Sequence, residues 1–118
     1  MKKIKFNYRD VVGGYDENMN LKTELKETTG YYFKIDDYHF VVYKHIFDSG
    51  YCGGWRVTEL TSGGGVTILR PTRRKALEYL ERMQQRKWNG FDFFTKLKQQ
   101  VDEKIRLYGV ANDPATLD

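Results

Sequence analysis

The side chains best suited to covalent or metal chemistry in this sequence are one cysteine and two histidines, Cys52, His39 and His45. A thiol beside an imidazole is the pairing of nucleophilic catalysis, and the same trio with an aspartate could ligate zinc. His39 and His45 share strand parity and could lie on one sheet face. However, Cys52 lies among glycines rather than at an activating helix N-terminus, and zinc-ligand spacing is absent. We therefore predict no catalytic residue, metal or cofactor, and keep a small Cys/His enzyme or metal protein as an alternative.

Three consecutive glycines at 63–65 raise the question of a phosphate-binding loop. Such a loop leads from a strand into a helix N-terminus and carries Lys followed by Ser or Thr at fixed spacing. Here the glycines precede the β-prone run VTIL instead. They therefore predict a hairpin turn in which glycine supplies positive φ angles. The adjacent Asp36 and Asp37 are likewise typical of a turn rather than of a catalytic carboxylate pair.

Positive charge is concentrated in the second half of the chain. The net charge is +4 over 118 residues, but residues 70–98 contain nine Lys or Arg against three Asp or Glu, a net charge of +6. Such a segment favours contact with phosphates or with an acidic protein surface, although a solvated helix pair would carry the same charges. The cationic residues predicted to bind a partner are Arg70, Arg73, Arg74, Lys75, Arg82, Arg86 and Lys87.

An aromatic and basic sheet face is the second predicted binding feature. Tyr32, Lys34 and Tyr43, with His39, could form a platform on which the bases of a single strand stack. The alternative is that Tyr32 and Tyr43 pack beneath another segment. A further alternative is that the face around Tyr32, Val41 and Tyr43 forms the contact of a homodimer.

The elements that must position these side chains begin with strands. Residues 3–9 alternate apolar and polar side chains, which predicts a strand that ends at the glycines 13–14. Residues 16–29 favour a strand or an irregular segment. Residues 31–46 predict a hairpin that turns at Asp36–Asp37, so that Ile35 pairs with Tyr38. A second hairpin is expected to turn at residues 63–64 and to place Val66 and Ile68 on the face of residues 55 and 57.

Two amphipathic helices are predicted after Pro71. Thr72 is placed to cap the first helix, whose apolar side is closed by Trp88 and which ends at residues 89–90. Within it, Glu78 lies four residues before Arg82 and is positioned to pair with it. Asp92 is placed to cap the second helix, and Gly109 to end it.

The fold class predicted from these patterns is α+β: an antiparallel sheet of about four to five strands in two hairpins, followed by two C-terminal amphipathic helices. A hydrophobic content of 40% and one cysteine predict a single domain, residues 1–109, that is held by packing alone, with a loose tail over 110–118. No run of residues is apolar enough for a signal peptide or membrane span, so we expect a cytoplasmic protein with no membrane partner.

The runs WRVTELTSG, VTIL and TRRKALEYL, within residues 55–80, resemble a pattern found in small accessory proteins of phages and mobile elements of Gram-positive bacteria. Some proteins of this general build are anti-CRISPR inhibitors, which block an RNA-guided nuclease without catalysis. The resemblance implies a non-enzymatic inhibitor of a nucleic-acid-handling complex. Because the chain is basic, we expect contact with RNA or an acidic nuclease surface rather than DNA mimicry. A single-stranded nucleic-acid-binding module (RNA or single-stranded DNA) is an alternative.

Overall fold

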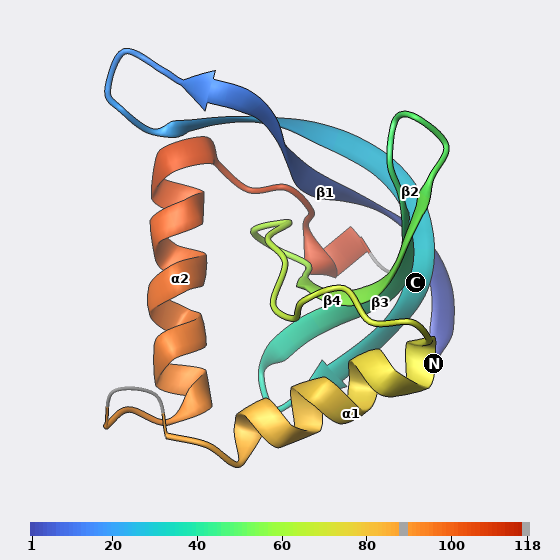
Figure 1. Ribbon diagram of the computed structural model, residues 1–118. Helices are drawn as coiled ribbons and strands as arrows, with labels where there is room; N and C mark the ends of the chain where they lie inside the picture. Colours follow the sequence, from blue (N-terminus) through green and yellow to red (C-terminus); the bar gives the residue numbers. More distant parts are fainter. Residues whose placement is uncertain (88–89, 117–118) are drawn as a thin grey trace.

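A computed structural model describes residues 1–87 and 90–116, which form a curled antiparallel sheet and two helices (Figure 1). The predicted α+β class is confirmed, with four strands in the order β1-β2-β3-β4. The elements are β1 (Lys2–Tyr15), β2 (Leu21–Ile35), β3 (Tyr38–Ile46), β4 (Cys52–Glu59), α1 (Arg73–Gln84), α2 (Phe93–Tyr108) and a short 3₁₀ turn (Pro114–Thr116). α1 lies beneath the sheet and packs on β3 and β4, and α2 lies beside the sheet.

The hairpin of β1 and β2 is longer than the sequence indicates. The predicted end at residues 13–14 is wrong, because the strand shifts register after Val11 and pairing resumes between Tyr15 and Leu21. The two glycines absorb this irregularity with positive φ angles of 94° and 68°. The Asp16 carboxylate then closes the turn by accepting hydrogen bonds from the backbone N–H groups of Asn18 and Asn20. Most of residues 16–29 therefore belongs to β2.

The hairpin of β2 and β3 has the predicted register. Ile35 pairs with Tyr38, and Asp36 adopts the left-handed conformation (φ 51°) that a two-residue turn requires. One face of this hairpin packs against both helices and contributes Phe40 and Val42, each fully buried, to the main core. The alternate residues of the hairpin lie on the opposite face of the sheet.

That other side is a second, smaller core rather than an open surface. Val41 and Tyr43 are 0% and 1% exposed, because the sheet curls until Phe6 and Tyr8 of β1 lie over them. The Tyr43 ring lies 5.2 Å from Phe6 and 5.1 Å from Tyr8, centroid to centroid. The curl therefore converts part of the predicted aromatic and basic face into a packed aromatic interior.

The chain between β4 and α1 reverses, but the predicted two-residue turn at 63–64 is wrong, because Thr58 is bridged to Gly65 and the loop is longer; no regular fifth strand forms among the described residues. Gly63 has the expected positive φ (72°), and the returning segment is bridged to β4 at Thr58–Gly65 and Trp55–Arg70. Between these bridges the Thr67 hydroxyl accepts the Val57 N–H in place of a backbone carbonyl. Val66 packs against the main core, whereas Ile68 is 56% exposed, so the prediction that it shares the core face of residues 55 and 57 is wrong.

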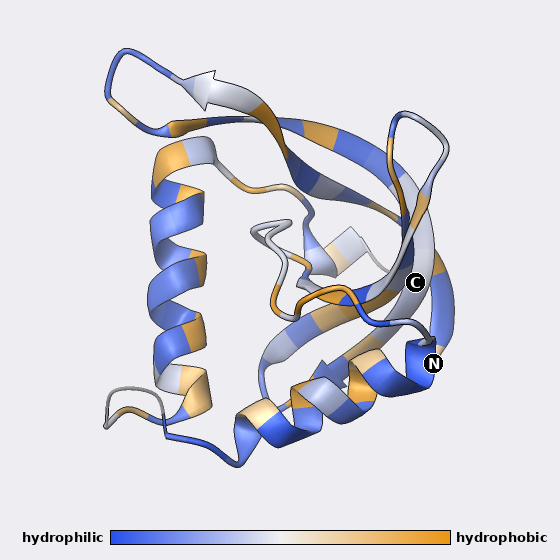
Figure 2. Cartoon of the chain, viewed as in Figure 1, coloured by the Kyte–Doolittle hydropathy of each residue, from blue (hydrophilic) through white to orange (hydrophobic). Residues whose placement is uncertain are grey.

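Both helices begin at the predicted caps. The hydroxyl of Thr72 accepts from the N–H of Lys75, and the carboxylate of Asp92 accepts from the N–H of Thr95. α2 ends at Gly109 (φ 85°), with its apolar residues turned toward the sheet (Figure 2). α1 ends at Gln84, earlier than predicted, and Trp88 and the residue after it lie outside the described residues. Neither helix is long and apolar enough to cross a membrane.

The segment after α2 differs from the predicted loose tail. Ala111 is buried, and its N–H donates to the carbonyl of Thr61. The side-chain amide of Asn112 forms the two hydrogen bonds with β1 that a neighbouring strand would form. It accepts from the N–H of Asn7 (2.8 Å) and donates to the Asn7 carbonyl (2.7 Å). The same amide donates to the carbonyl of Leu60, so the C-terminal segment ties β1 to the loop after β4.

Candidate nucleic-acid interface

One flank of α1 presents arginines around a tyrosine. Tyr79 and Arg82 are three residues apart, which places them on one side of α1, and Arg86 follows two residues after the helix ends. Arg70 joins them from the segment before the helix. Its backbone is held beside Trp55 by two reciprocal hydrogen bonds of 2.7 Å, so the start of the flank is fixed to β4.

These four side chains, with Met83, line a cleft of about 230 Å³. The guanidinium carbons of Arg70 and Arg82 lie 5.7 Å and 5.8 Å from the centre of the Tyr79 ring. Contacts of this kind orient a guanidinium while leaving its charge in place. Among residues 1–87 and 90–116, no carboxylate forms an ion pair with any of the three arginines.

The other cations of the predicted set are not part of this cleft. Arg73 lies over the ring of Tyr31, 4.5 Å from its centroid. Arg74 pairs with Glu78 at 3.1 Å, so the predicted pairing of Glu78 with Arg82 is wrong. Two further predicted cations, Lys75 and Lys87, are exposed.

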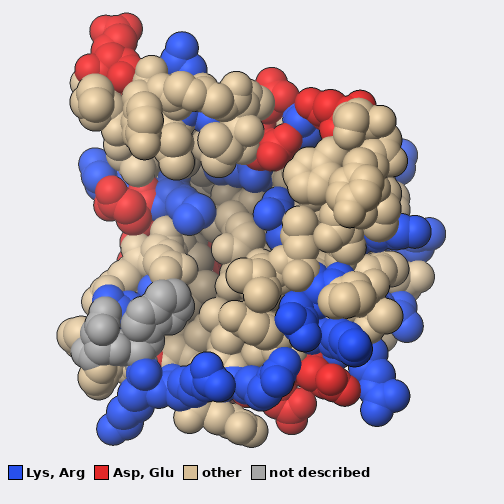
Figure 3. Space-filling model, in the orientation of Figure 1, with Lys and Arg blue, Asp and Glu red and all other residues tan. Residues whose placement is uncertain are grey.

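The basic side chains nevertheless share one edge of the molecule. Figure 3 shows a row of Lys and Arg side chains over α1, interrupted by acidic side chains at one point. The helix has 12 residues and therefore spans about 18 Å. A row of this length can follow several phosphates of a nucleic-acid strand, because phosphates recur along each strand of a duplex every few ångströms.

The predicted aromatic platform is not assembled. Tyr43 is buried, so its predicted role in direct partner binding is wrong, and the alternative that it packs beneath another segment is confirmed. Tyr32 stacks on His39 and hydrogen bonds to its Nδ1 (2.7 Å). Lys34 is exposed beside them. With one ring buried and the other engaged, the sheet face lacks the pair of open rings that base stacking was expected to use.

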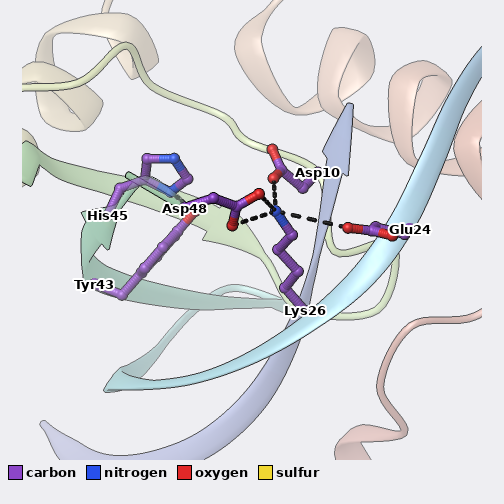
Figure 4. Close-up of polar contacts among 6 residues, drawn as sticks. All are labelled: Asp10, Glu24, Lys26, Tyr43, His45 and Asp48. Atoms are coloured by element: carbon purple, nitrogen blue, oxygen red, sulfur yellow. Dashed lines mark hydrogen bonds and ion pairs between the residues drawn. The ribbon is translucent and has the colours of Figure 1, made fainter. Parts of the chain in front are cut away.

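A polar cluster at the rim of the curled sheet is a feature that sequence reasoning missed (Figure 4). Lys26 of β2 contacts Asp10 of β1 at 2.5 Å and Asp48, in the loop after β3, at 2.9 Å. Hydrogen bonds to these two carboxylates raise the pKa of Lys26 above its usual range. The residues are 16 and 22 positions apart, and no local spacing links them. The cluster ties two strands to a loop.

Beneath this rim lies a chain of hydrogen bonds. Arg56 Nε donates to the Tyr43 hydroxyl at 2.7 Å, and that hydroxyl lies 3.3 Å from Nδ1 of His45. Burial raises the pKa of Tyr43 to about 12 and, with the nearby Arg56 charge, lowers the pKa of His45. Both side chains are therefore neutral near pH 7, which suits a packed interior.

The Cys52, His39 and His45 trio is not brought together. The two histidines share a face of β3, as predicted, but they are six positions apart, which separates them by about 20 Å along the strand. Cys52 is exposed on β4 opposite Ile46. Within the described part of the chain, no three His, Cys, Asp or Glu side chains are grouped to hold a metal ion.

Comparison with known proteins adds nothing to this geometry. No protein-family model, curated protein or solved structure matches the chain. The chemistry available at the α1 flank is therefore argued from its residues: guanidinium groups donate paired hydrogen bonds that fit the oxygens of a phosphate, and they stay charged at any physiological pH.

Proposed function

We propose that this protein binds nucleic acid, RNA or single-stranded DNA, through the phosphates, without catalysis. The observation that carries the proposal is the convergence of Arg70, Arg82 and Arg86 around Tyr79 with no carboxylate partner among the described residues. A positive surface of this kind attracts a polyanion over a distance and holds it by charge-assisted hydrogen bonds.

The contact we propose reads the backbone rather than the bases. Sequence is read through base edges or open aromatic rings, and the ring in the cleft, Tyr79, already has Arg70 and Arg82 against it. Binding is therefore expected to be independent of sequence and strongly dependent on salt, because each neutralised phosphate releases a counterion.

The biological setting we propose is a phage-type inhibitor of a nucleic-acid-handling complex, in the manner of anti-CRISPR proteins. Its support is the resemblance of residues 55–80 to accessory proteins of phages and mobile elements, together with the basic surface. In this setting the protein occupies RNA or a nuclease surface and thereby prevents the complex from working.

The test is a titration of fluorescently labelled RNA, single-stranded DNA and duplex DNA by anisotropy at several salt concentrations. Replacing Arg82 and Arg86 by Gln should weaken binding by tenfold or more and reduce the slope of log K against log salt by about two. A control variant with Lys22 and Lys98 replaced by Gln loses the same charge on β2 and α2 and should bind nearly as well as the unaltered protein. Equal losses in both variants, or no binding of any nucleic acid, would refute the proposal.

A further inference from the structure

The cleft between Arg70 and α1 has the size of a small anion site. Its volume of about 230 Å³ is below the roughly 300–1,000 Å³ of pockets that enclose drug-sized ligands. The guanidinium carbons of Arg70 and Arg82 lie 5.7 Å and 5.8 Å from the centre of the Tyr79 ring, so the cleft offers cations beside its one aromatic ring. The space suits a single phosphate group whose attached sugar remains outside.

Three arginines that line one cleft favour a phosphate monoester over a diester. A monoester carries a charge of about −1.5 to −2 near pH 7 and offers three terminal oxygens, as a phosphorylated side chain does. A diester inside a nucleic-acid strand carries one negative charge and only two non-bridging oxygens. Three arginines around one diester would leave at least one of them without its own oxygen, since each guanidinium is suited to paired hydrogen bonds.

Arg70 is half-buried, whereas the other two cleft arginines, Arg82 and Arg86, are exposed. Its Nε is buried and has no hydrogen-bond partner among the described residues. Because this Nε is buried, a phosphate in the cleft is expected to accept hydrogen bonds from the terminal N–H groups of Arg70 rather than from Nε. The backbone of Arg70 is fixed to Trp55, so the guanidinium is presented to the cleft from a rigid attachment point.

From these observations we infer that the cleft binds the terminal phosphate of a nucleic-acid strand, so that the protein prefers phosphorylated strand ends. The inference rests on the proposed function, because the cleft uses the same arginines as the backbone contact. The remaining cations of the α1 row then hold the diester phosphates that follow the end.

The experiment compares short single-stranded oligonucleotides of one sequence that carry a 5′-phosphate, a 3′-phosphate or only hydroxyl ends, in anisotropy titrations at fixed salt. A strand with a terminal phosphate at one of the two ends should bind about tenfold more tightly than the hydroxyl-ended strand. Inorganic phosphate at matched ionic strength should weaken binding of the phosphorylated strand more than that of the hydroxyl-ended strand, and so abolish this preference.

Substitutions distinguish the contribution of paired hydrogen bonds to the end preference from the contribution of charge alone. Arg86→Lys keeps the charge but loses the planar fork, and should reduce the end preference while retaining most binding of the hydroxyl-ended strand. Arg70→Gln should remove the preference. Arg74→Gln, on the same helix but paired with Glu78, should keep it. Thermal unfolding of each variant verifies that it is folded.

The outcomes distinguish the two proposals. Equal affinity for phosphorylated and hydroxyl ends, with binding still dependent on Arg82 and Arg86, overturns the end-binding inference and leaves the proposed function standing. Failure of every oligonucleotide to bind overturns both. A preference that survives Arg70→Gln also overturns the inference, because the phosphate is then held elsewhere.

Discussion

Guanidinium groups in this protein lie over aromatic rings more often than beside carboxylates. Among the described residues, five arginines face a ring, whereas only Arg74 and Arg106 form ion pairs. A ring orients an arginine without neutralising it, so these side chains keep their charge for an external anion. The basic surface thus depends on where tyrosines lie as much as on the arginines themselves.

The lowered pKa of His45 predicts that the stability of the protein depends on pH. Burial lowers its pKa in the folded protein, so the unfolded chain takes up a proton first as pH falls from about 7 to about 5. The free energy of unfolding should therefore fall over this range, by at most about 1.4 kcal/mol per pH unit from this group. Urea unfolding at a series of pH values measures the slope.

The matched variants are His45→Gln and His39→Gln. The slope between about pH 7 and about pH 5 should flatten when His45 is replaced and persist when His39 is replaced. A slope that is unchanged in His45→Gln would assign the pH dependence to other groups.

At the scale of the elements, the curl of the sheet is the feature on which both cores depend. Gly30 lies in β2 where it crosses the second core, and it is buried. A Cβ at this position would come within 2.5 Å of Cγ1 of Val41 and 2.9 Å of Cβ of Tyr43. Glycine is thus required here for close packing of β2 on β3 and not for an unusual backbone angle.

Gly30→Ala should accordingly destabilise the protein by about 1–3 kcal/mol, as overpacking of a dense interior does. Denaturant unfolding monitored by tyrosine and tryptophan fluorescence gives the value. The exposed neighbour provides the control: Thr29→Ala should change stability by less than about 0.5 kcal/mol. Equal effects of the two substitutions would mean that β2 does not approach β3 as closely as described.

Thr72 links helix formation to the binding surface. Its hydroxyl accepts from the N–H of Lys75 at 3.1 Å, and α1 carries Arg82, one of the three cleft arginines. Thr72→Ala should lower stability by about 0.5–2 kcal/mol, whereas Thr72→Ser should restore most of it. Thermal unfolding measures both, and a Ser variant as unstable as the Ala variant would show that the cap hydrogen bond is not the cause.

At the scale of the whole molecule, the C-terminal segment links β1, at the start of the chain, to the loop after β4. β1 is the edge strand of the sheet, yet its backbone is engaged by Asn112 and, through the N–H of Arg9, by the carbonyl of Gly63. Arg9 also donates to the carbonyl of Tyr108 at the end of α2. These contacts protect part of an edge that would otherwise be open to pairing with another chain.

Asn112→Ala should therefore destabilise the protein by about 1–3 kcal/mol, since the Asn7 N–H and the Leu60 carbonyl lose their partner in a half-buried position. Asn112→Asp still accepts from Asn7 but cannot donate, and should be intermediate or worse. The comparison is made by denaturant unfolding. A loss no larger than that of Thr116→Ala, on the exposed last turn, would mean that the segment is not a structural tie.

Local patterns in the sequence determined the fold class, the β2–β3 register and the caps at Thr72 and Asp92, because strand alternation, turn residues and capping side chains act over a few positions. They also placed Arg82 beside Tyr79 on one side of α1, since helical spacing alone decides this. Tertiary structure decided the rest. That Tyr43 is buried, that Arg70 joins the α1 flank, and that Asn112 meets Asn7 all depend on how far the sheet curls. The curl results from packing between residues that are distant in sequence, so no local spacing of residues predicts it.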